Sequence, residues 1–134
     1  MMKKLFITLL LFCSTLKADI AVITNIDNHL VLTKQEIEEI FMGRTHTLSN
    51  GDFVLPLDHN ALRSEFYLKL TNRPIEQINS YWARILFSGQ ASPPPKLPDD
   101  AAVINTVIKN KSAIGYIDNK NANTKLIHVL FILN

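Results

Sequence analysis

The sequence predicts an α/β domain in which helices pack around a mixed sheet. Three observations support this prediction. Short apolar runs rich in β-branched residues lie at residues 20–24 and 126–133, as expected for strands. Between them, apolar residues recur every three or four positions in several segments, which is the period of an amphipathic helix. Turn-forming residues such as Asn50 and Gly51 separate the two kinds of segment.

The first 18 residues have the pattern of a secretory signal peptide. Lys3 and Lys4 precede an apolar run over residues 5–13, and the small residue Ala18 follows at a suitable distance for cleavage. The run is too short to span a bilayer, which requires roughly 20 residues. A retained membrane anchor is the alternative interpretation. We therefore expect a periplasmic protein with one domain over residues 19–134 and no stable membrane insertion after cleavage.

Cleavage would change the composition of the chain. Cys13 is the only cysteine, so the mature chain would contain neither a disulfide nor a thiolate metal site. The loss of Lys3, Lys4 and Lys17 would leave 11 basic side chains against 12 acidic ones. Such a balance gives no electrostatic surface for nucleic acid. The fold must then depend on burial of apolar side chains, and no cofactor is expected.

The first helix is predicted by its two ends. Residues 20–24 are predicted to form a buried strand and residues 25–29 a turn. Thr33, followed three residues later by Glu36, is a capping box. An apolar face follows, and Gly43 suits the left-handed conformation that ends many helices.

Residues 53–57 predict the next strand, which Pro56 places near a sheet edge or at a strand end. After residue 58 the apolar period changes from two to about 3.6. Asn60 is the expected cap of a second helix, whose apolar face carries Leu62, Phe66 and Leu70.

A third helix is expected after Pro74, which suits a first helical turn. Its apolar stripe contains Ile78, Trp82 and Ile85 and ends near Gly89. Tyr81 lies off this stripe and is therefore the more exposed aromatic candidate for a binding surface. The proline-rich residues 92–98 predict an extended surface loop.

The remaining elements are a helix and two strands. Asp99 or Asp100 caps the helix, and residues 113–117 return as a strand. The nearly continuous apolar character of residues 126–133 predicts a last strand that is buried on both faces.

Two motifs connect this order of elements to a known family. The segments VLTKQEIEEIFMG (residues 31–43) and AIGYID (Ala113–Asp118) resemble landmarks of the periplasmic phosphate-binding proteins of ABC transporters. The resemblance extends over about residues 25–118 and covers only the second of that family's two lobes. It implies a single periplasmic-binding-protein-like lobe with a mixed sheet flanked by helices. It also implies a solute-binding module associated with phosphate transport.

The family's ligand region corresponds to the segment DHNALRS, residues 58–64. Here the strand ends in Asp58 rather than the arginine of the family, and Ser64 alone keeps a family hydroxyl. The tentative ligand-binding residues are therefore Asp58, Asn60, Arg63 and Ser64. Asn60 and Ser64 would donate hydrogen bonds to an anion, and Arg63 would supply charge. The alternative is that Arg63 pairs with Asp58 or Glu65 and only orients the turn.

Two functional classes follow from these features. The first is an exported module that binds phosphate or another small anion. The second is an envelope interaction module that reuses one lobe without binding phosphate. One lobe has no opposing wall, which a homodimer or another envelope protein could supply. An enzyme is not expected, because the histidines are scattered and the patterns of zinc hydrolases and nucleophile elbows are missing from the sequence.

Overall fold

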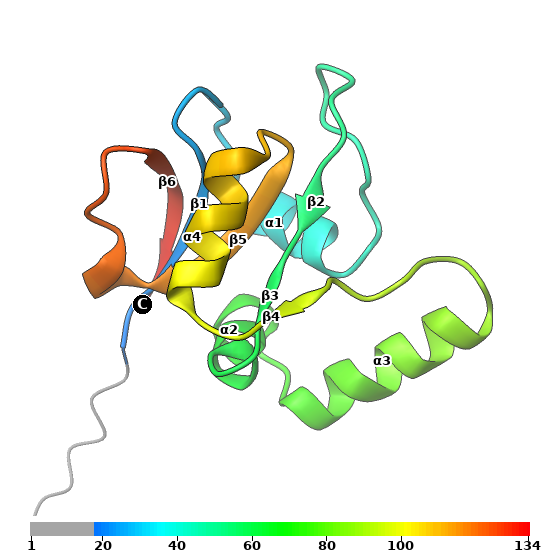
Figure 1. Ribbon diagram of the computed structural model, residues 1–134. Coiled ribbons are helices and arrows are strands. Elements are labelled where there is room, and N and C mark those ends of the chain that lie inside the picture. Colours follow the sequence, from blue (N-terminus) through cyan, green and yellow to red (C-terminus); the bar gives the residue numbers. More distant parts are fainter. Residues whose placement is uncertain (1–17) are drawn as a thin grey trace, which may run out of the picture.

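A four-stranded mixed sheet lies at the centre of the molecule, with helices on both of its faces (Figure 1). The computed structural model describes residues 18–134. The predicted signal peptide, apart from Ala18, lies outside these residues. The elements are β1 (Ile20–Asn25), α1 (Lys34–Phe41), β2 (Leu55–Pro56), β3 (Asp58–His59), α2 (Arg63–Thr71), α3 (Ile75–Phe87), β4 (Lys96–Leu97), α4 (Asp100–Lys109), β5 (Ala113–Asp118), a 3-10 turn (Asn119–Asn121) and β6 (Ile127–Leu133).

The strand order in the sheet is β2-β5-β1-β6. β1 pairs antiparallel with both β5 and β6, whereas β2 runs parallel to β5. β3 and β4 form a separate parallel pair of two residues each. The predicted α/β class with a mixed sheet flanked by helices is therefore confirmed.

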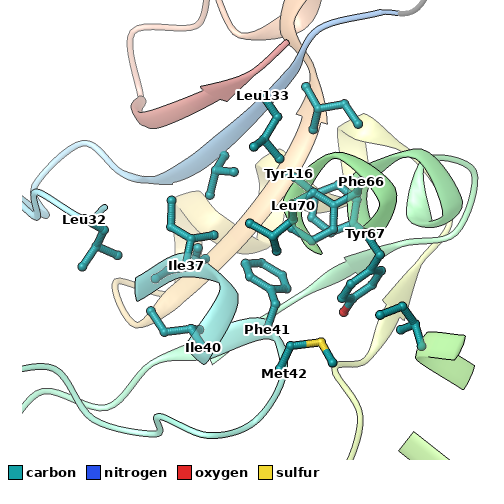
Figure 2. Close-up of a cluster of buried hydrophobic side chains, with 14 of the residues drawn as sticks. Leu32, Ile37, Ile40, Phe41, Met42, Phe66, Tyr67, Leu70, Tyr116 and Leu133 are labelled. Atoms are coloured by element: carbon teal, nitrogen blue, oxygen red, sulfur yellow. The ribbon is translucent and has the colours of Figure 1, made fainter. Parts of the chain in front are cut away.

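Side chains of β1 alternate between two apolar cores, because successive residues of a strand point to opposite faces. Ile20 and Val22 pack with α1, α2 and α3, in a core centred on the rings of Phe41, Phe66 and Tyr116 (Figure 2). Ala21 and Ile23 instead pack under α4. Every residue of β1 is buried, as predicted for this strand.

The predicted helix ends are observed at α1 and α4. The Thr33 hydroxyl accepts a hydrogen bond from the Glu36 amide at 3.2 Å, and the Asp99 carboxylate accepts one from the Ala102 amide at 2.8 Å. Gly43 has a φ of +71°. A Cβ at Gly43 would lie 2.6 Å from Cη2 of Trp82, so both the backbone and the packing require glycine here.

Three predictions about this part of the fold were wrong. β6 is not buried on both faces, because it lies at a sheet edge and most of its side chains are partly exposed. An apolar run cannot distinguish an edge strand from a central one. Of the strand predicted at residues 53–57, only Leu55 and Pro56 form a strand, β2, and the next strand, β3, begins after the predicted range. The proline-rich loop also contains a strand, β4, which pairs with β3.

The described residues contain no helix that is long and apolar enough to cross a membrane. The same part of the chain contains no cluster of three or more His, Cys, Asp or Glu side chains that could hold a metal ion.

Candidate functional site

The four predicted ligand residues lie around the turn that joins β3 to α2. Asp58 is in β3 and is fully buried. Arg63 is the first residue of α2 and is also buried. Asn60, in the turn, and Ser64, in the first turn of the helix, are exposed. The structure thus divides the predicted set into a buried pair and an exposed pair.

Asp58 is the centre of a buried hydrogen-bond network. Its Oδ1 atom accepts hydrogen bonds from the hydroxyls of Tyr67, at 2.9 Å, and Tyr116, at 3.1 Å. Its Oδ2 atom accepts from Nε of Arg63 at 3.2 Å. Three donors therefore replace the water that a buried carboxylate loses. The network connects β3, α2 and β5.

Arg63 is held by more than this ion pair. Its Nη1 atom donates to Oδ1 of Asn79 in α3 at 2.6 Å, and its guanidinium lies 5.4 Å from the ring centroid of Tyr67. Of the two alternative partners that the sequence suggested, the structure selects Asp58, because Glu65 instead lies 3.7 Å from Lys69. Two of the five guanidinium N–H groups are used in these hydrogen bonds, and the side chain is 10% exposed. The remaining N–H groups are the candidate donors to a ligand.

The pKa values in this network follow from burial. Burial raises the pKa of the Asp58 carboxyl, and the hydrogen bond from Tyr67 and the charge of Arg63 oppose this shift. The pKa values of Tyr67 and Tyr116 are raised far above the ordinary value of 10.0, first by burial and then by the negative charge of Asp58. Both hydroxyls therefore stay protonated and remain donors.

We expect the protein to lose stability above about pH 10 because of these two tyrosines. Their folded-state pKa values exceed the unfolded value, so the unfolded chain releases protons that the folded chain retains. Their contribution is complete below pH ~10 and declines above it by about 1.4 kcal/mol per pH unit for each tyrosine. Urea unfolding between pH 8 and pH 11, compared with Tyr67→Phe, measures this decline. If the free energy of unfolding declines equally steeply above pH 10 in both proteins, the decline does not come from Tyr67, and the prediction is wrong.

The start of α2 has no side-chain cap. Leu62, rather than the predicted Asn60, occupies the N-cap position, with φ −100° and ψ −2° and no capping hydrogen bond from its side chain. The prediction was wrong because residues 60–62 form a turn before the helix begins. The first amides of a helix have no partner within it, and a missing cap leaves them free to bind an anion.

His59 fixes the other side of the same turn. Its Nδ1 atom accepts a hydrogen bond from the Leu62 amide at 3.3 Å, so Nε2 carries the proton in the neutral ring and donates to Oδ1 of Asp100 at 2.6 Å. Asn121 donates to the other oxygen of Asp100 at 2.6 Å. Sequence reasoning missed this contact because 41 residues separate its partners.

Tyr81 was predicted to be an exposed aromatic candidate, and this prediction was wrong. It is only partly exposed, and its hydroxyl donates to the carbonyl of Met42 at 2.6 Å. Trp82 is in the core, as its place on the apolar stripe predicted. Tyr81 therefore connects α3 to the end of α1.

The fold of the chain resembles a single lobe in two solved structures. The chain is similar to the crystal structure of an ABC-type phosphate transport receptor from Vibrio cholerae, with a TM-score of 0.64 and 14% identity. It is also similar to a putative phosphate ABC transporter substrate-binding protein with bound phosphate from Clostridium perfringens, with a TM-score of 0.65 and 18% identity. No family model matches the chain, and no curated protein matches it in sequence.

The extent of these matches agrees with a single lobe. Each match covers 84% of this chain, but it covers only 46% of the Vibrio cholerae protein and 45% of the Clostridium perfringens protein. The chain therefore spans about half the length of the solved structures it resembles. At this level of identity the likeness establishes the fold alone.

Proposed function

We propose that the chain is an exported, non-enzymatic solute-binding module that holds a small, phosphate-like anion at the start of α2. The observation that carries this proposal is the uncapped start of that helix beside a fixed arginine. The helix amides, the exposed side chains of Asn60 and Ser64, and the unused N–H groups of Arg63 would bind the anion. A similar fold that contains bound phosphate supports the choice of ligand.

The charges around this position set the expected strength of binding. Asp58 already neutralises Arg63, so the anion gains from the hydrogen bonds and the helix dipole more than from net charge. Glu65 lies in the same helical turn, but the Lys69 ammonium 3.7 Å away offsets its charge. We therefore expect weaker binding than in a two-lobe protein that closes around its ligand.

Ser64→Asp is expected to weaken phosphate binding at least tenfold while leaving the fold intact. A carboxylate at this exposed position would occupy the free amides and repel the anion, and it would stabilise the helix by about 0.3–1 kcal/mol. Calorimetry with phosphate and a panel of other small anions on residues 19–134 measures the affinity. Ser49→Asp, in an exposed loop, is the matched control. Binding that survives Ser64→Asp unchanged would show that the anion is held elsewhere.

The second candidate is an interaction module that binds another envelope protein and no anion. The neutralisation of Arg63 by Asp58 favours this candidate, because a neutral buried pair can serve the fold alone. No heat of binding with any anion, together with a stable complex with a periplasmic protein, would support it over the first.

A further inference from the structure

The exposed face of α3 has a pattern that is symmetric about Ser80. Glu76 and Arg84 lie four residues before and after Ser80, and Arg73 and Phe87 lie seven residues before and after it. At 100° per residue Glu76, Ser80, Arg84 and Phe87 share one side of the helix, opposite the buried residues Ile78 and Trp82, whereas Arg73 lies just before the N-cap Pro74. All five residues of the pattern are exposed.

We propose that this face binds the same face of a second copy of the chain, with the two α3 helices antiparallel about a two-fold axis at Ser80. In an antiparallel pair centred on Ser80, each Glu76 lies opposite an Arg84. Phe87, the last residue of each α3, then lies near the start of the other α3, which Arg73 precedes. The pattern is thus complementary to itself, as a two-fold interface requires.

Each contact in this arrangement has a physical basis. Glu76 and Arg84 form two symmetric ion pairs, and neither side chain has an ion-pair partner within residues 18–134. The Phe87 side chain is 97% exposed and offers its ring face to an arginine. Ser80 is small enough to let the two helices approach each other.

The position and shape of α3 also suit such a contact. In Figure 1 the helix lies at the periphery of the molecule, away from the central sheet. Its outer face carries a shallow pocket of about 500 Å³, which Arg73, Glu76 and Arg84 help to line and which can receive side chains of the second copy. The helix has 13 residues, so the contact is smaller than a standard interface of about 1,600 Å² and the dimer is in reversible equilibrium.

The test is the mass of residues 19–134 in solution, measured by sedimentation between about 10 μM and about 1 mM. These concentrations cover dissociation constants that correspond to binding free energies of roughly 4–7 kcal/mol. We expect the mean mass to rise toward that of a dimer with concentration. A purely monomeric protein over the whole range would overturn the proposal.

Charge reversal identifies the surface. Arg84→Glu places like charges opposite each other in both symmetric contacts and is expected to weaken the dimer at least tenfold. Combining it with Glu76→Arg restores opposite charges and is expected to restore the dimer. Lys125→Glu, in an exposed loop, is the matched control and should have no effect. A dimer that responds to the control as strongly as to Arg84→Glu, or that the double reversal does not restore, would overturn the proposal.

A cysteine at the symmetry axis supplies an independent measurement. The chain from residue 19 onward contains no cysteine, so Ser80→Cys introduces a single thiol. The two thiols would meet at the axis, and oxidation is expected to give a disulfide-linked dimer much faster than in Ser49→Cys. Equal rates for the two variants would contradict the antiparallel arrangement.

Discussion

Replacing Asp58 with alanine is expected to lower the free energy of unfolding by about 3–5 kcal/mol. The Asp58 side chain is fully buried and accepts hydrogen bonds from Arg63, Tyr67 and Tyr116. Its removal leaves the Arg63 guanidinium buried without a counter-charge and two hydroxyls without an acceptor. Urea unfolding at pH 7 measures the loss.

Asp27→Ala is the matched control, because Asp27 is exposed and forms only a long surface ion pair, 3.9 Å, with Lys111. We expect a change of less than about 0.5 kcal/mol for this variant. Asp58→Asn keeps an acceptor of the same shape and removes the charge. Comparing it with Asp58→Ala therefore distinguishes the contribution of the ion pair to stability from that of the hydrogen bonds. A loss below about 1 kcal/mol for Asp58→Ala would mean that the network does not support the fold.

Phe66→Ala is expected to cost about 3–5 kcal/mol of stability. The Phe66 ring is stacked on Tyr116, with centroids 3.6 Å apart and planes within 5°, and its centroid is 4.8 Å from that of Phe41 (Figure 2). Removing the ring leaves a cavity where α1, α2 and β5 meet. It also takes away the ring against which Tyr116 is stacked, and Tyr116 donates to Asp58.

Phe87→Ala, measured in dilute solution, is the control for this substitution, because the Phe87 side chain is almost fully exposed. Equal losses of unfolding free energy for Phe66→Ala and Phe87→Ala would contradict the packing described for the core around Phe41, Phe66 and Tyr116. Combining Phe66→Ala with Tyr116→Phe in a double-mutant cycle tests the connection to the network, since contacting residues have coupling energies of about 0.5–3 kcal/mol.

Local signals in the sequence were sufficient for most of the fold. The caps at Thr33 and Asp99 and the left-handed glycine at residue 43 act within a few residues. Sequence alone therefore located the ends of α1 and placed the start of α4 to within one residue. The place of β6 at the sheet edge depends on strand order. Strand order is set by contacts between distant segments, and an apolar run carries no information about it.

The site was harder to predict than the fold, for the same reason. The proximity of Asp58 to Arg63 could be inferred because five residues separate them across one turn. The hydroxyl of Tyr116 reaches Asp58 across 58 residues, and Asn79 reaches Arg63 from another helix. A buried aspartate requires donors, but the sequence does not identify them.

Titration of residues 19–134 with phosphate, followed by the backbone amide signals in NMR spectra, tests the proposed binding site most directly. Binding at the start of α2 predicts saturable shifts that are largest for the amides of Arg63, Ser64 and Glu65 and are lost in Ser64→Asp. Saturable shifts centred on another part of the chain would contradict this binding site. The absence of shifts at phosphate concentrations up to about 10 mM would contradict it as well, since this limit is equivalent to roughly 3 kcal/mol of binding free energy.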